Sequence, residues 1–217
     1  MHNMLSDTPF QGVNIDMAKI LEKLGSTVVA GIVLAIILVV IMVIWHGQGL
    51  ALDTGWWAFA FRWLHVLAGI MWIGHLWYFN FTQIPTMPKI PAELKPGVSK
   101  FIAPAALFWF RWGAMVTIAS GIILALLNGY FVEAVTIGLI DGVPKHTMIG
   151  IGMWLGTIMW FNVWFIIWPN QQKALGLVPA DDATKAKSAR TAMLFSRTNT
   201  MLSIPMLYAM VAAQNIF

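Results

Sequence analysis

The sequence contains no cysteine and few charged residues. Without cysteine the chain has no disulfides, thiolate metal sites, iron–sulfur clusters or covalently attached c-type haem. Only 10% of the 217 residues are charged, whereas a soluble domain usually carries about 25%. So few polar side chains exclude a water-soluble enzyme, a disordered chain and a nucleic-acid binder.

The sequence is instead rich in apolar residues, which make up 59% of the chain and gather in long runs. A membrane's hydrocarbon core requires about 20 apolar residues per helix, and no run alternates with the period of two of a barrel strand. We therefore predict an all-α integral membrane helical bundle in the lipid bilayer. Its five expected spans are residues 27–45, 57–81, 101–127, 147–168 and 201–216.

The N-terminal residues differ from the rest of the chain. They lack the basic start, short apolar stretch and small-residue cleavage site of a signal peptide. Apolar residues from Ile15 to Leu24 recur at near-helical spacing among charged ones, which is typical of a helix on the membrane surface. We predict an amphipathic surface segment over 1–26 and a single transmembrane domain over 27–217.

The basic residues of the connections are distributed unequally between the two sides of the predicted bundle. Ten Lys and Arg residues lie on the side of the N-terminus, and only Lys145 lies on the other. By the positive-inside rule, the N-terminus is expected in the cytoplasm and the C-terminus outside. Four prolines between 85 and 96 predict a stiff, extended second loop, and 176–190 is expected to be a solvated hinge or a short surface helix.

Charged and imidazole side chains inside an apolar span are costly, so they mark candidate functional sites. The span assignment sorts them into two layers. The outer layer contains His46, Arg62, His65 and His146. The inner layer contains His75, Asn80, Arg111 and Asn162. No span contains Asp or Glu, which argues against a proton-coupled transporter or a pump.

Two histidines at similar depth on different helices are what axial ligation of a b-type haem requires. We predict His65 and His146 as the metal ligands, with His46 in reserve and Arg62 pairing with a propionate. His75 and Arg111 are predicted to form a second polar site, either for a further cofactor or for a quinone. Two alternatives remain open: each histidine only hydrogen-bonds a neighbouring helix carbonyl, and the glycines of 150–156 serve close helix packing instead of a macrocycle.

Three stretches resemble the membrane domain of the bacterial urate oxidases, the family named for a urate oxidase N-terminal region. The first is 63–74, with His65, Trp72 and Gly74, followed by Tyr78 and Phe79. The other two are 109–121, with Arg111, and 161–171, which ends in Trp-Pro-Asn-Gln. The resemblance implies a helical domain of the bacterial inner membrane linked to oxidation chemistry.

Full-length members of that family carry more spans and a C-terminal cytochrome c domain, whereas this chain has no cysteine to hold a c-type haem. An electron acceptor is therefore expected in a separate subunit, such as a cytochrome c. Three functions follow as hypotheses: a b-haem electron-transfer module in a larger redox complex, a cofactor-free accessory subunit of a respiratory or oxidase complex, and a membrane oxidase acting on urate or a similar small molecule.

Overall fold

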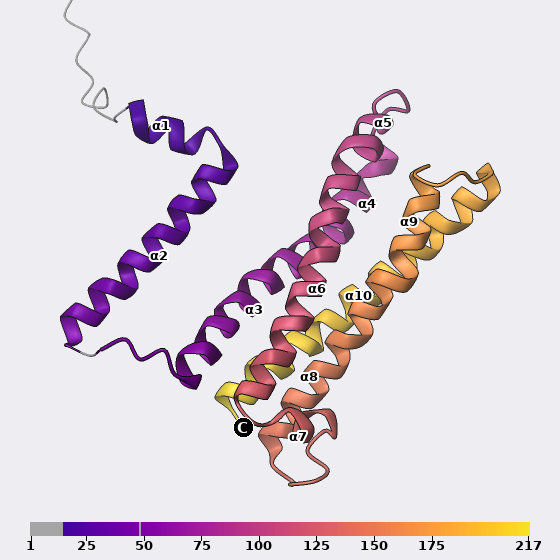
Figure 1. Ribbon diagram of the computed structural model, residues 1–217. Helices are drawn as coiled ribbons and strands as arrows, with labels where there is room; N and C mark the ends of the chain where they lie inside the picture. The colour runs from indigo at the N-terminus through magenta and orange to yellow at the C-terminus, as the bar shows by residue number, and fades with distance from the viewer. Residues whose placement is uncertain (1–14, 48) are drawn as a thin grey trace, which may run out of the picture. The chain divides into compact units, whose positions relative to one another are not determined.

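The computed structural model describes residues 15–47 and 49–217, and all regular structure within them is helical (Figure 1). The all-α prediction is confirmed for this part of the chain. The chain divides into two compact units, Met1–Ala51 and Leu52–Phe217, and each is described by itself.

The first unit consists of α1 (Ile15–Leu21) and α2 (Leu24–His46). The 23 residues of α2 include no Asp, Glu, Lys or Arg, and at 1.5 Å per residue they extend about 35 Å, enough to cross a bilayer. The helix ends at Gly47, whose φ of 64° reverses the chain in the left-handed conformation that glycine adopts at little cost. Residues 1–14 of the predicted surface segment lie outside the described residues.

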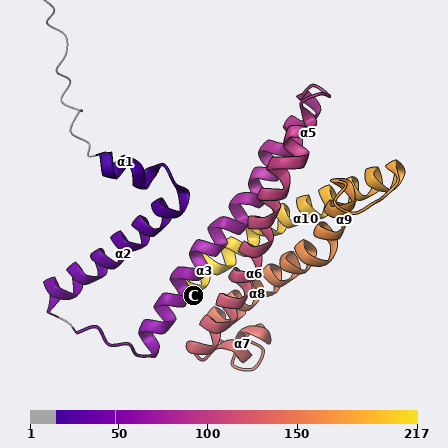
Figure 2. The same ribbon diagram turned by 45° about the horizontal axis from the view of Figure 1, so that its top comes forward.

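The second unit begins with two long helices that pack side by side, α3 (Thr54–Trp77) and α6 (Ala103–Leu127) (Figures 1 and 2). The Asp53 side chain caps α3 by accepting a 2.9 Å hydrogen bond from the Trp56 N–H. Gly113 lets the two backbones approach, because a Cβ there would lie 3.1 Å from the Trp72 nitrogen. The region where Trp72 meets α6 forms part of the main apolar core.

A proline follows each of three π-helical turns in this unit, namely η1 (Tyr78–Gln83), η3 (Val98–Ile102) and η4 (Asn162–Ile167). The prolines are Pro85, Pro104 and Pro169, each at the second position of the next helix. Proline lacks an N–H and its ring clashes with the carbonyl four residues earlier. The wider i→i+5 turn accommodates that ring, so the helix continues where a regular α-helix would kink or end.

These turns correct the predicted proline-rich loop. After η1 the chain remains helical through α4 (Ile84–Thr86) and η2 (Met87–Lys89), and it becomes helical again at α5 (Lys95–Gly97). Only the few residues between η2 and α5 are non-helical, so an extended loop over 85–96 was wrong. The reason is that Pro88 and Pro96 stand at the second position of helical turns, where a missing N–H costs little, and that Pro85 follows the π-helical turn η1.

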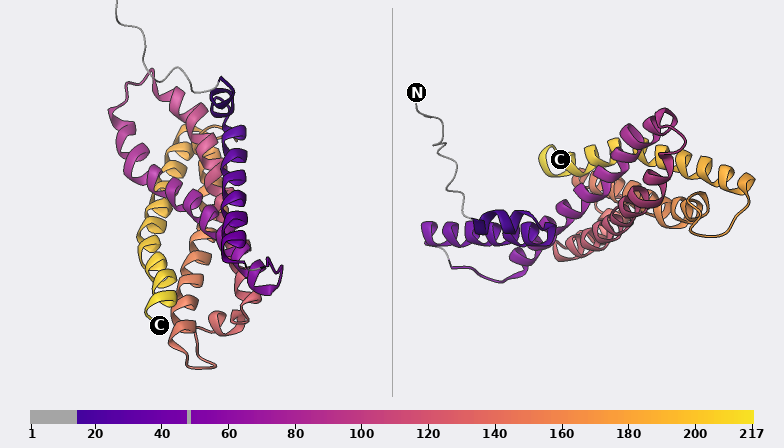
Figure 3. Two further views of the ribbon diagram at one scale, coloured as in Figure 1. Left: turned by 90° about the vertical axis from the view of Figure 1, so that its left-hand side faces the viewer. Right: turned by 90° about the horizontal axis from the view of Figure 1, so that it is seen from above.

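The second half of the unit consists of α7 (Phe131–Val135), α8 (Pro144–Phe161), α9 (Trp168–Ala174) and α10 (Asp182–Asn215). The 34-residue α10 packs along α8, η4 and α9 (Figure 3). Near its C-terminus Ala213 joins Ala134 of α7 and Ile149 of α8 in a small apolar cluster. Residues 182–190 of the predicted hinge or surface helix and the fifth span are therefore parts of one helix, which begins at 182 and passes through Pro205 without ending.

Four stretches of helix among the described residues are long and apolar enough to cross a membrane: Leu24–His46, Thr54–Lys89, Lys95–Leu127 and Pro144–Ala174. They correspond to the first four predicted spans, and each extends beyond the predicted bounds at one or both ends. The C-terminal part of α10 is less apolar and is not among the four. The structure thus supports a membrane protein with four such helices.

Candidate functional site

The side chain of His65 extends from α3 toward α6. Its Nδ1 is 2.9 Å from the Thr117 carbonyl oxygen and 3.3 Å from the Ser120 hydroxyl. Because a carbonyl only accepts, Nδ1 carries the ring hydrogen and Nε2 keeps its lone pair. The imidazole lies over Gly121, where a Cβ would be 2.9 Å from its Cε1 atom. The first and second stretches of the family resemblance, 63–74 and 109–121, thus meet at this contact.

His75 lies ten residues after His65 on α3, and its Nδ1 is 2.7 Å from the Met71 carbonyl oxygen. The same reasoning places the hydrogen on Nδ1 and leaves Nε2 without a hydrogen-bond partner among the described residues. Ten residues separate the two histidines, so they stand about 15 Å apart along the helix axis.

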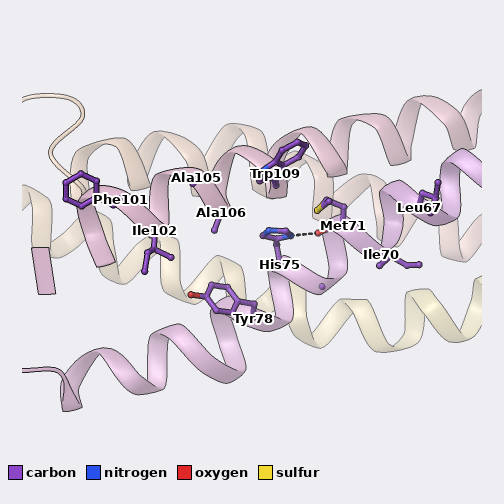
Figure 4. Close-up of a pocket in the computed structure, with 11 residues that line it drawn as sticks. Leu67, Ile70, Met71, His75, Tyr78, Phe101, Ile102, Ala105, Ala106 and Trp109 are labelled. Atoms are coloured by element: carbon purple, nitrogen blue, oxygen red, sulfur yellow. Dashed lines mark hydrogen bonds between the residues drawn. The ribbon is translucent and has the colours of Figure 1, made fainter. Parts of the chain in front are cut away.

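His75 also lines a groove of about 930 Å³, which we call the α3–α6 groove. Its remaining lining residues are Leu67, Ile70, Met71, Gly74, Tyr78, Phe101, Ile102, Ala105, Ala106 and Trp109. Figure 4 shows the His75 ring among Met71, Tyr78 and Trp109, with its hydrogen bond to Met71. The imidazole and the Tyr78 phenol are the titratable side chains of an otherwise apolar lining, which is the usual make-up of a site for an apolar ligand.

Two predicted outer-layer residues, His146 and Arg62, lie at or near the α7–α8 connection. The His146 Nδ1 is 2.5 Å from an Asp141 carboxylate oxygen, and the His146 ring stacks on Tyr130 with centroids 5.9 Å apart. The hydrogen bond from His146 lowers the pKa of Asp141. Burial raises the pKa of the Tyr130 phenol, and the charge of Arg62 opposes that rise, which places Arg62 within electrostatic range.

The structure thus brings Arg62 and His146 toward one cluster, whereas His65 contacts α6. No hydrogen bond, ion pair or ring contact joins His65 to His146 among the described residues, so their pairing as ligands stays a prediction. His46 lies exposed at the end of α2, in the other unit. The described residues include no group of three or more His, Cys, Asp or Glu side chains arranged to hold a metal ion.

Arg111 has surroundings unlike those of His75. Its Cζ lies 3.2 Å from the centroid of the Trp168 ring and 6.0 Å from that of Trp164. The Nε and Nη1 atoms are buried and have no hydrogen-bond partner. Trp109 of the groove is two residues earlier on the helix, a rotation of about 200°, so Arg111 projects from the opposite face of α6. His75 and Arg111 therefore belong to two different places.

Sequence reasoning missed a polar seam on α10. Asn199 is fully buried, accepts a 2.8 Å hydrogen bond from the Asn162 amide and donates to the Met159 carbonyl. Ser196 and Ser203 of the same helix accept hydrogen bonds from Asn80 and Trp77. The signal was the recurrence of small or amide residues at steps of three and four: Ser188, Ala192, Ser196, Asn199 and Ser203.

The glycines of α8 serve helix packing in this structure. A Cβ at Gly150 would collide with the Ala134 carbonyl oxygen of α7. A Cβ at Gly152 would lie 3.1 Å from the Met210 methyl group of α10. Of the two interpretations of these glycines, close packing within the chain is the one that these contacts support.

The family model described as urate oxidase N-terminal matches residues 143–215. The matched segment, about a third of the chain, is similar to that family. The match contains α8, η4, α9 and α10, and with them His146, the Trp164–Trp168 pair beside Arg111, and the asparagines of the seam. His65, His75 and Arg111 lie outside the matched residues. Neither the comparison with curated proteins nor that with solved structures gives a match.

Proposed function

We propose that this chain is a membrane-embedded b-haem electron-transfer module and one subunit of a larger redox complex in the bacterial inner membrane. The family name associates the matched segment with an oxidase, and the sequence of α3 supplies imidazoles at two depths of a span-capable helix. The observation that carries the proposal is His75, whose Nε2 is free beside the apolar α3–α6 groove.

The residues of the groove fit a flat apolar cofactor by their chemistry. A ligating histidine usually donates its other ring nitrogen to a carbonyl or carboxylate, which fixes the tautomer and the ring orientation. The Met71 carbonyl does this for His75, and the Thr117 carbonyl does it for His65. Haem held by such an imidazole would carry single electrons, and the apolar lining would exclude water from it.

We keep the outer pair of His65 and His146 as a second proposed ligand set. Both rings are held through Nδ1, and Arg62 lies within electrostatic range of the Tyr130 ring that stacks on His146. Arg62 would then pair with a propionate at this end of α3. An external electron acceptor, such as a separate cytochrome c, completes the proposal.

We further propose five crossings, with the N-terminus in the cytoplasm. The support is that α10 lies along the whole of α8–η4–α9, a stretch long and apolar enough to span. No charged residue occurs after Arg197, and the 18 residues of 198–215 extend about 27 Å as a helix. The bulk of the loop Lys and Arg residues would then face the cytoplasm.

A cofactor-free accessory subunit is the second candidate, and the fit of His65 into α6 favours it. An imidazole that hydrogen-bonds a helix carbonyl and fills the space over a glycine is sufficient as a packing contact. Under this alternative, His65→Ala lowers stability and assembly and leaves the visible spectrum unchanged.

A haem assay of the chain purified from its native membrane, with the pyridine haemochrome method, tests the proposal. We expect haem b in the wild-type chain, a loss of most of it in His75→Ala, and wild-type content in His46→Ala. Loss in His65→Ala and His146→Ala, with retention in His75→Ala, would move the ligand site to the outer pair. Folded wild-type protein without haem would overturn the proposal in favour of the accessory subunit.

A further inference from the structure

Arg111 is a cation for which the membrane-spanning helices offer no counter-charge. None of the nine Asp and Glu residues of the sequence lies within the four span-capable helices. A charge inside a span is expensive and normally has a partner. Stacking on Trp168 compensates part of this cost, because the ring face attracts a cation.

Stacking satisfies the face of the guanidinium but not its edge. The N–H groups of arginine lie in the plane of the group and point outward, where they match a carboxylate or a phosphate with two parallel hydrogen bonds. In this chain Nε and Nη1 have no partner, and each belongs to a different edge of the guanidinium, completed in both cases by Nη2. The indole Nε1 of Trp164, the second ring near Arg111, is also buried without a partner.

The unpaired atoms at this place are all donors. Three donor nitrogens from α6 and η4 lack acceptors, and a ligand that satisfies them must supply acceptor oxygens. Arg111 as a residue is only partly buried, so part of its side chain is open to a ligand. Trp168 is five residues, or about 7.5 Å along the helix, before Lys173, which lies near the end of the stretch Pro144–Ala174. Tryptophan this close to the end of a span favours the membrane interface.

We propose that Arg111 and Trp164 form an oxyanion-binding site, with the guanidinium held on Trp168, on the face of α6 opposite the α3–α6 groove. The ligand chemistry is a phosphate-type oxyanion, supplied either by a phospholipid headgroup or by free phosphate. This site does not depend on haem, because it uses neither histidine of α3.

Thermal unfolding of the delipidated chain in detergent, at constant ionic strength, tests the site. The additions are dioctanoyl phosphatidylglycerol, inorganic phosphate and dioctanoylglycerol, the last of which lacks the phosphate. A ligand that binds only the folded chain raises the unfolding temperature, and we expect a rise on the order of 5 °C near saturation. A rise with the phospholipid alone identifies the headgroup as the source, and a rise with both phosphate compounds identifies the phosphate itself.

Two variants make the test specific to the site. Arg111→Gln should abolish the rise, whereas Arg197→Gln, at an exposed position of α10, should keep it. Trp164→Phe keeps an aromatic ring and removes only the N–H, so it should reduce the rise, with Trp63→Phe as its exposed control. The proposal is overturned if dioctanoylglycerol acts as strongly as the phospholipid, if neither phosphate compound has an effect, or if Trp164→Phe and Arg111→Gln both respond as the wild type does.

Discussion

At the residue scale, the contact between His65 and Gly121 sets how closely the outer parts of α3 and α6 approach. The imidazole is fixed by the Thr117 carbonyl, so it has little freedom to move away from α6. Gly121 provides the space that the ring occupies, whereas Gly69 of α3 has nothing within 4 Å of its own missing Cβ. A methyl group at Gly121 would therefore collide with a neighbour, whereas one at Gly69 would meet open space.

Gly121→Ala should destabilise the chain by about 1–3 kcal/mol, because the added methyl displaces the ring or separates the helices. Gly69→Ala should be neutral or stabilising by about 0.5–1 kcal/mol, since alanine favours the helix. Unfolding temperatures of the two variants in detergent compare them directly. Equal effects of the two substitutions would show that the His65 contact does not limit the approach of the helices.

Asp141 is the residue whose ionisation we expect to affect stability in acid. Its pKa is lowered below the ordinary 3.8, first by the hydrogen bond from His146 and also by the Val143 N–H. A carboxyl whose pKa is depressed by folding stabilises the fold above its unfolded pKa, and this contribution disappears as the pH falls through the folded value.

The unfolding temperature of Asp141→Asn should therefore lie below that of the wild type above about pH 4 and approach it at lower pH. Glu93→Gln, in the exposed turn before α5, serves as the control and should follow the wild-type curve. A constant offset between Asp141→Asn and wild type across this range would exclude the ionised pair as the source of the difference.

At the element scale, α8 packs through glycines that differ in how much space they have. A Cβ at Gly150 meets the backbone of α7 at the Ala134 carbonyl, which cannot rotate away, whereas a Cβ at Gly156 has its nearest atom at 3.9 Å, in the flexible Ile118 side chain. Gly150→Ala should therefore cost about 2–3 kcal/mol or prevent folding, and Gly156→Ala should cost less than about 1 kcal/mol. The yield of folded protein and its unfolding temperature measure both, and a well-tolerated Gly150→Ala would contradict the α7–α8 contact.

Most helices were predictable from the sequence, because lipid selects residues that are apolar around the whole helix and such runs are easily recognised. The length of α10 was not predictable from the sequence, because its buried face consists of serine, alanine and asparagine, which in isolation look like surface residues. The π-helical turns were also missed, because a proline usually indicates the end of a helix, and the wider turn before it depends on neighbouring helices.

The candidate site was predictable in its residue types more than in its arrangement. His65, His75, His146 and Arg111 were recognised because each is expensive in a span. The separation of these side chains into different places could not be predicted. Depth along a helix follows from sequence spacing, whereas the direction of a side chain depends on which face of its helix meets a neighbour. The clearest example is the pair of His75 and Arg111. His75 lines the groove on one side of α6, and Arg111 projects from the other side.

At the scale of the whole molecule, the absence of cysteine allows a direct test of the proposed topology. Single cysteines at Leu139→Cys, Leu177→Cys and Ile216→Cys would lie in three exposed segments. With five crossings, a membrane-impermeant maleimide should label 139 and 216 in intact cells and 177 only after lysis. Labelling of 177 and 216 from the same side would contradict a crossing by α10.

The central claim is that the histidines of α3 hold a redox-active haem b. The dithionite-reduced minus oxidised visible spectrum of the natively purified chain tests it most directly. We expect a sharp b-type α-band that is lost in His75→Ala and preserved in His46→Ala. A flat spectrum from folded wild-type protein, or a band that survives alanine substitution of His65 and His75 together, would contradict it.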